Sequence, residues 1–142
     1  MLNHHKLEIH QRENEGIVIL DLHGRLVLGS GEIELRDFVQ SLLESGNRQA
    51  TLNLASVSEI DMSGAGVLLF LAAEYSNASG KLVLFNVPIA HGEIYEMARL
   101  EASIEIYSAE LDAINSFFPD RKTSHYDILS YVESQKEPDG KA

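Results

Sequence analysis

The sequence contains no cysteine in 142 residues, and it lacks any long apolar run. Without cysteine no disulfide can form, so we expect a reducing compartment, with the cytoplasm as the natural location. Every apolar run is shorter than the roughly 18 residues that a membrane-spanning helix needs. The start, "MLNHHKLEIHQRENEG", is interrupted by charges and has no apolar core of a secretory signal. These absences argue against an integral membrane protein and against a disulfide-stabilised secreted one.

Basic residues are also scarce. Eleven Lys and Arg stand against 22 Asp and Glu, which gives a formal net charge of −11. Nucleic-acid binding depends on Lys and Arg that neutralise phosphates, and anionic membranes also attract basic surfaces. The charge therefore argues against nucleic acid and lipid as partners. It is compatible with a well-solvated surface or with selection for a basic partner.

What the sequence does contain is an alternation of short apolar segments. Two strands, 6–13 and 16–24, are joined at "ENEG" as a hairpin. The predicted elements that follow are a helix at 31–45, a strand at 49–56, a buried helix at 64–80, a strand at 81–87, a helix at 88–101, a strand at 103–108 and a helix at 108–118. The β-α-β order implies parallel strands with right-handed crossovers. The sequence therefore predicts an α/β fold of order ββαβαβαβα with a small mixed sheet.

The chain becomes more polar after Pro119. We divide it into a domain at 1–118 and a C-terminal extension at 119–142. Within the extension, four apolar residues could form one face of a short helix: Tyr126, Ile128, Leu129 and Val132. The final "QKEPDGKA" has the composition of a free tail.

The most informative stretch is "SEIDMSGAG", residues 58–66, at the start of the buried helix. The first backbone N–H groups of a helix have no internal partner and favour an oxygen or an anion. One interpretation is that Asp61 or Ser63 caps this helix and that Gly64 and Gly66 serve packing. The other is that the Ser63 hydroxyl is displayed for modification or partner contact. A phosphate there would be favoured by the helix N-terminus and repelled by Asp61.

Other motifs do not support catalysis. "GAGVLL" has the first two glycines of a dinucleotide-binding fingerprint, but Leu69 occupies the third position. "DMSGAG" is no nucleophile elbow, because Asp61 stands where a glycine should precede the serine. Of the histidines, only His4 and His5 are close together, near a terminus that we expect to be mobile. His23 and His91 are more often ordinary polar positions than metal ligands. We predict a protein that is not an enzyme and that has no cofactor or metal.

Residues 6–118 resemble the STAS domain, the family of bacterial anti-sigma-factor antagonists and of the cytoplasmic domains of sulfate-type transporters. Three motifs carry the resemblance in order: "G-x-L" at Gly24 to Leu26, "D-x-S-G-x-G" at Asp61 to Gly66, and "G-x-L-x-L" at Gly80 to Leu84. The resemblance implies a small sheet with helices mainly on one face. It also implies a partner-binding surface at the start of the buried helix.

The resemblance also implies a phosphorylation site, from which this chain departs. In phosphorylated relatives, a kinase-type anti-sigma factor modifies a serine or threonine directly after the aspartate of the motif, and the phosphate abolishes binding. That position is Met62 here, which has no hydroxyl. Ser63, one place on, is the candidate phosphoacceptor. Val27 is a second departure, because the antagonists commonly have an acidic residue after "G-x-L".

Taken with the resemblance, these motifs predict an anti-sigma-factor antagonist that binds a kinase-type anti-sigma factor and so releases a sigma factor. The predicted surface comprises the 58–66 loop, the helix start and the Gly24 to Gly29 turn, with these motif residues: Asp61, Met62, Ser63, Gly64, Gly66, Gly24, Leu26 and Val27. Val67, Leu68 and Phe70 are assigned to the core, because a helix that is apolar on all sides is buried. The alternatives are a docking or regulatory subunit of a transporter or sensory complex, without a phosphoswitch, and a domain that binds a small ligand such as a nucleotide.

Overall fold

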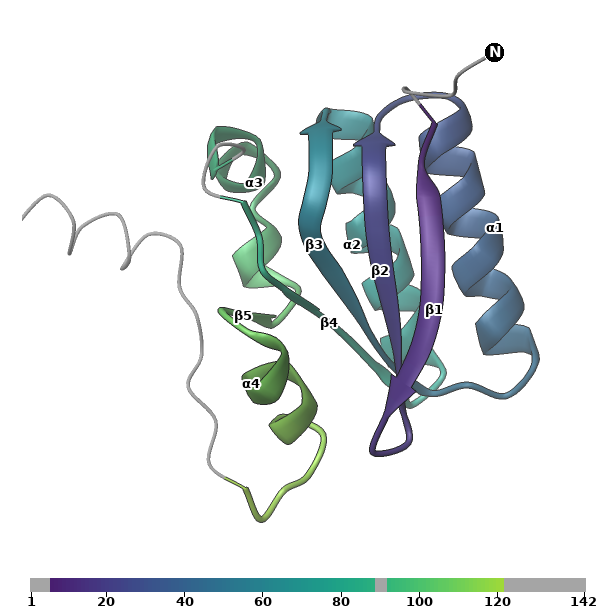
Figure 1. Ribbon diagram of the computed structural model, residues 1–142, viewed down its shortest axis with the longest axis vertical. Coiled ribbons are helices and arrows are strands. Elements are labelled where there is room, and N and C mark those ends of the chain that lie inside the picture. Colours follow the sequence, from purple (N-terminus) through teal and green to yellow (C-terminus); the bar gives the residue numbers. More distant parts are fainter. Residues whose placement is uncertain (1–5, 89–91, 122–142) are drawn as a thin grey trace, which may run out of the picture.

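The computed structural model describes residues 6–88 and 92–121 (Figure 1). Its strands are β1 (Glu8–Asn14), β2 (Ile17–Leu26), β3 (Gln49–Ile60), β4 (Lys81–Phe85) and β5 (Ile106–Tyr107). Its helices are α1 (Ser30–Glu44), α2 (Met62–Asn77), α3 (Gly92–Ala98) and α4 (Glu110–Asn115), with a short 3-10 turn, η2, at Leu100–Ala102. The predicted order of strands and α-helices is confirmed.

The strands form one mixed sheet in the order β1-β2-β3-β4-β5. β1 runs antiparallel to β2, and β2 to β5 run parallel to one another. The predicted hairpin turns at Glu15 and Gly16, whose φ angles are +54° and +83°. Two positive φ angles are the geometry of a tight hairpin whose twist matches that of its strands. The mixed sheet and the hairpin are therefore as the sequence predicted.

Hydrophobic residues pack on both faces of the sheet. Alternate residues of β2, Val18, Leu20 and Leu22, join the larger core with α1 and α2. Ile17 and Ile19, at the other alternate positions of the strand, join a smaller core under α4. Because successive side chains of a strand point to opposite faces, α4 covers the face opposite α1 and α2. Figure 1 shows α2 passing behind β2 and β3. The helices lie mainly on one face, as predicted.

β3 continues four residues beyond its predicted end, and this changes the central motif. Its buried apolar residues near the end are Leu54, Val57 and Ile60, three apart rather than two. The register with β2 shifts twice, between Asp21 and His23 and between Gly24 and Arg25. Such irregularities disturb the strict alternation by which a strand is recognised. The predicted loop at 58–66 is therefore wrong, because strand and helix are separated by Asp61 alone.

Other element boundaries also differ from prediction. β2 continues through Leu26, so the predicted turn at 24–29 is reduced to the residues after Leu26. β5 has only two residues, and Pro88, the predicted start of the next helix, is not helical. The predicted helix around Tyr126 to Val132, and His4, His5 and His91, lie outside the described residues. No helix in the ranges 6–88 and 92–121 is long and apolar enough to span a bilayer.

Candidate functional site

Asp61 connects two segments that meet at the carboxyl ends of β2 and β3. It is the N-cap of α2, and its Oδ1 accepts a hydrogen bond from the Gly64 N–H at 2.8 Å. Its Oδ2 accepts a second bond from the Leu28 N–H at 3.0 Å. A side-chain cap of this kind stabilises by about 1 kcal/mol. The capping interpretation is therefore confirmed for Asp61, which also holds the β2–α1 connection beside the start of α2.

The two motif glycines have different roles. A Cβ on Gly64 would overlap the carbonyl oxygen of Leu26 and lie 3.0 Å from Cγ1 of Ile60. This close contact between α2 and the end of β2 requires glycine. A Cβ on Gly66 would have no neighbouring atom within 4 Å, and Gly66 is exposed. Packing explains Gly64 and does not explain Gly66.

Of the "G-x-L" residues, Gly24 and Arg25 are half-buried and Leu26 is buried. Gly24 has a φ angle of +110°, and a Cβ there would overlap the carbonyl oxygen of Lys6. The Leu26 side chain is completely buried in the larger core, and Val27 is half-buried. Gly24 and Leu26 therefore hold the end of β2 in place. The Leu26 side chain is not available at the surface.

An apolar patch surrounds the start of α2. It consists of Leu28, Met62, Gly66 and Phe70, in which the three side chains are 70%, 46% and 42% exposed. Residues 62, 66 and 70 are spaced by four and share one helix face. The Asp61 hydrogen bond places the backbone of Leu28 next to this helix start. We call these four residues the apolar patch.

The assignment of Phe70 to the core is wrong, whereas Val67 and Leu68 are buried as predicted. A helix that is apolar all round does not show which of its faces meets the sheet, so its sequence could not separate Phe70 from its neighbours. The spacing of Met62, Gly66 and Phe70 by four residues could have shown that they share one helix face. Leu28 had no such signal, because the bond that positions it joins residues far apart in the chain.

Ser63 occupies the second position of α2 and is half-buried. Its hydroxyl has no hydrogen-bond partner within the described part of the chain. The first turn of α2 holds no acidic residue, so Asp61 supplies the carboxylate nearest in sequence. Within the described residues this hydroxyl makes no side-chain hydrogen bond, and Ser63 directly follows Met62 of the apolar patch.

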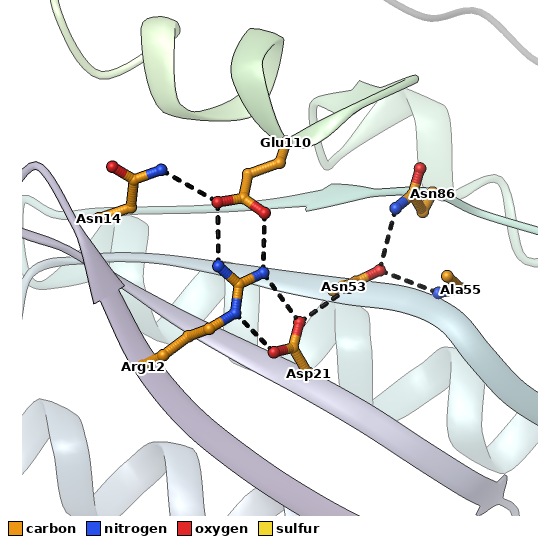
Figure 2. Close-up of polar contacts among 7 residues, drawn as sticks. All are labelled: Arg12, Asn14, Asp21, Asn53, Ala55, Asn86 and Glu110. Carbon is orange, nitrogen blue, oxygen red and sulfur yellow. Dashed lines mark hydrogen bonds and ion pairs between the residues drawn. The ribbon is translucent and has the colours of Figure 1, made fainter.

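The most extensive polar cluster lies on the other face of the sheet and anchors α4 (Figure 2). The Arg12 guanidinium donates to both oxygens of Asp21, at 2.6 and 3.1 Å. It also donates to both oxygens of Glu110, at 3.0 and 2.7 Å. Asn14 donates to Glu110, and Asn53 donates to Asp21. These hydrogen bonds, first of all those from Arg12, hold the pKa values of Asp21 and Glu110 below their usual range.

In this cluster the carboxylates are fully engaged in hydrogen bonds between elements. Both oxygens of each carboxylate accept hydrogen bonds from Arg12 or a neighbouring amide. Figure 2 shows the Arg12 guanidinium between the carboxylates of Asp21 and Glu110. Sequence analysis missed the cluster, because its members come from β1, β2, β3 and α4. Across the described ranges, no group of three or more His, Cys, Asp or Glu residues is placed to hold a metal ion.

Comparison with known proteins identifies the family to which this fold belongs. The family model of the STAS domain matches residues 8–113. No curated protein matches the chain in sequence. A protein of Thermotoga maritima described as an anti-sigma factor antagonist, TM1081, superposes with a TM-score of 0.70 at 19% identity, over 76% of this chain and 92% of that one.

Two further structures show the range of proteins that carry this fold. The Bacillus anti-sigma factor antagonist SpoIIAA, in its unphosphorylated form, has a TM-score of 0.61 at 16% identity, over 80% of this chain and all of that one. The murine anion transporter Slc26a9 has a TM-score of 0.53 at 20% identity, over 72% of this chain and 18% of the transporter. At these identities the likeness concerns the fold. Together with the match over residues 8–113, it shows that the chain belongs to the STAS domain family.

Proposed function

We propose that this chain is a protein-binding module of the anti-sigma factor antagonist type, not an enzyme, and that the apolar patch is its docking surface. The observation that carries the proposal is the exposure of Leu28, Met62 and Phe70 around the start of α2. SpoIIAA and TM1081, which are described as anti-sigma factor antagonists, are covered over nearly their whole length, which supports a chain of the same kind. The partner proposed is a kinase-type anti-sigma factor, whose capture would release a sigma factor.

Burial of the patch would supply useful binding energy. Full burial of an exposed leucine, methionine or phenylalanine side chain contributes about 1.5 to 3 kcal/mol. The patch side chains are already partly covered, so about 1 kcal/mol each is a reasonable expectation. The absent side chain of Gly66 lets a partner approach the helix closely. The bonds of Asp61 hold the patch in one shape before binding, which lowers the entropy lost on docking.

Ser63 is the residue that we propose as phosphoacceptor, because Met62 has no hydroxyl. A phosphate on Ser63 would add a charge of about −2 beside the patch. A hydrated charge there opposes the burial of Met62, so phosphorylation would weaken docking. Incubation with an anti-sigma factor kinase and ATP should add one phosphate by intact mass, and Ser63→Ala should abolish it. No gain in mass would refute the phosphoswitch while docking is tested separately.

A second function has one specific observation in its favour. The chain superposes on a domain of the anion transporter Slc26a9, and a docking subunit of a transporter or sensory complex needs no hydroxyl at position 62. Such a subunit could use the same apolar patch. The partner that is recovered decides between the two functions.

Affinity capture from the native cell tests the proposal. The tagged chain is compared with Met62→Glu, which places a charge in the patch, and with Leu111→Glu. Leu111 is 67% exposed on α4, on the opposite face, and is the matched control. We expect an anti-sigma factor to be recovered with the unchanged chain and with Leu111→Glu, and to be lost with Met62→Glu. Recovery of transporter subunits without an anti-sigma factor would overturn the proposal.

A further inference from the structure

β1 leaves one edge of the sheet open. Within the described residues it pairs only with β2, so the backbone groups along its other side face outward. All residues of β1 except Ile9 are exposed. An unpaired edge of this kind is a template for an added strand. In Figure 1, α1 lies outside β1, beyond this edge.

A groove runs between this edge and α1. Its volume is about 780 Å³, and Gln11 of β1 lines it together with one face of α1. That face includes the apolar side chains of Ile33, Phe38 and Leu42. Ile33 is 46% exposed, whereas Phe38 and Leu42 are partly buried against the larger core. The groove therefore has an apolar floor that continues the core outward.

The groove and the strand have matching lengths. α1 has 15 residues and lines the groove from its first turn to its end, which corresponds to about 22 Å at 1.5 Å per residue. β1 has 7 residues, which correspond to about 23 Å at 3.3 Å per residue. One strand of about seven residues could pair with all of β1 while every second side chain lay over α1.

The charge of the groove indicates the kind of strand that fits. Glu34 and Asp37 line it, and neither has a cationic partner in the described part of the chain. The neighbouring ion pair of α1 joins Arg36 to Glu32 instead, at 3.5 Å. An incoming segment with Lys or Arg beside its apolar residues would neutralise both carboxylates. A second copy of this chain, with a net charge of −11, would add repulsion.

We propose that the open edge of β1 binds an extended, basic segment of a partner protein as an additional strand of the sheet. Its apolar side chains contact Ile33, Phe38 and Leu42, and its basic side chains pair with Glu34 and Asp37. Backbone hydrogen bonds to β1 provide affinity, and the alternating side chains provide specificity. The groove shares no residue with the apolar patch, so this binding does not depend on the function proposed above.

A peptide of defined sequence tests the proposal on the full chain. The probe is a fluorescein-labelled peptide Thr-Lys-Thr-Val-Thr-Ile-Thr-Lys-Thr, which presents lysines and apolar residues on one side when extended. Binding is measured by anisotropy at low ionic strength, where ion pairs are least screened. The variant Glu34→Lys/Asp37→Lys should weaken binding about tenfold or more. Glu44→Lys, at an exposed position of α1 outside the groove, should leave it within about twofold.

Hydrogen exchange followed by mass spectrometry locates the peptide. We expect exchange to slow in a fragment that contains residues 8–14 when the peptide binds. The absence of saturable binding, equal weakening by Glu44→Lys, or slowing only elsewhere would overturn the proposal. So would protection in the free chain of more amides in residues 8–14 than the pairing with β2 accounts for. Additional protection that rises with protein concentration would identify a second copy as the occupant, and additional protection independent of concentration would identify another segment of this chain.

Discussion

The Arg12 Nη2 atom lies 2.7 Å from Oε1 of Glu110, which joins β1 to α4 across 98 residues of sequence. The same guanidinium holds Asp21 of β2. Figure 2 shows how one side chain thereby connects β1, β2 and α4. α4 has only six residues and covers the smaller core, so it depends on such contacts.

Glu110→Gln removes the charge from this ion pair and keeps the side-chain shape. We expect the free energy of unfolding to fall by about 1 kcal/mol, because the pair is partly exposed and Arg12 keeps Asp21. Urea denaturation measures the change. Glu44→Gln, an exposed acid without an ion pair in the described residues, should change stability much less. Equal effects would show that the pair contributes nothing specific.

Stability should also depend on pH through the same carboxylates. The hydrogen bonds of Arg12 hold the pKa values of Asp21 and Glu110 below the ordinary 3.8 and 4.5. In acid, the unfolded chain therefore binds more protons than the folded chain. The contribution of these two carboxylates to the free energy of unfolding is fully present above pH 5 to 6, and it is lost as pH falls through the lowered pKa values. Urea midpoints between pH 7 and pH 3 should fall less steeply in Asp21→Asn/Glu110→Gln. An unchanged slope in that variant would contradict this origin.

The two motif glycines should respond oppositely to alanine. Gly64→Ala forces a methyl group against the Leu26 carbonyl, and we expect a loss of about 2 kcal/mol or more. Gly66→Ala meets open space in a helix, where alanine is favoured over glycine by up to about 1 kcal/mol. Thermal and urea unfolding of the two variants show whether each is more or less stable than the unchanged chain. A destabilising Gly66→Ala would mean that this position is packed.

Asp61 and Ser63 should differ in how much stability is lost when each is replaced by alanine. Asp61→Ala removes the acceptor of both the Gly64 and the Leu28 N–H groups, and should cost about 1 to 2 kcal/mol. Ser63→Ala removes a hydroxyl without a partner in the described residues and should cost less than about 0.5 kcal/mol. Asp61→Asn keeps the cap and should fall between them. A large loss in Ser63→Ala would show that its hydroxyl has a structural task.

Several features could be predicted because they depend on residues close together in the chain. The spacing of apolar residues predicted the order of the strands and helices, and "ENEG" predicted the hairpin turn at Glu15 and Gly16. Either Asp61 or Ser63 was expected to cap α2, since a cap forms within one helical turn. The three motifs together identified the fold family.

Other features depend on residues that only folding brings together. The register shifts of β2 and β3 concealed the end of β3, because they remove the alternation that marks a strand. The apolar sequence around Phe70 could not show which helix face meets the sheet. The network of Arg12, Asp21 and Glu110 had no local signal, since its atoms approach one another across three elements.

By itself, the sequence determined the class of the fold, the position of the 61–66 motif at a helix start and the presence of a cap at Asp61 or Ser63, because backbone preferences and hydrophobic periodicity act over a few residues. The tertiary structure alone decided the rest. Asp61 also binds the Leu28 N–H, Gly64 is required by the Leu26 carbonyl, and Met62 and Phe70 remain at the surface beside Leu28. These outcomes depend on how the ends of two strands and one helix pack, and such long-range packing leaves no pattern in any one stretch of the chain.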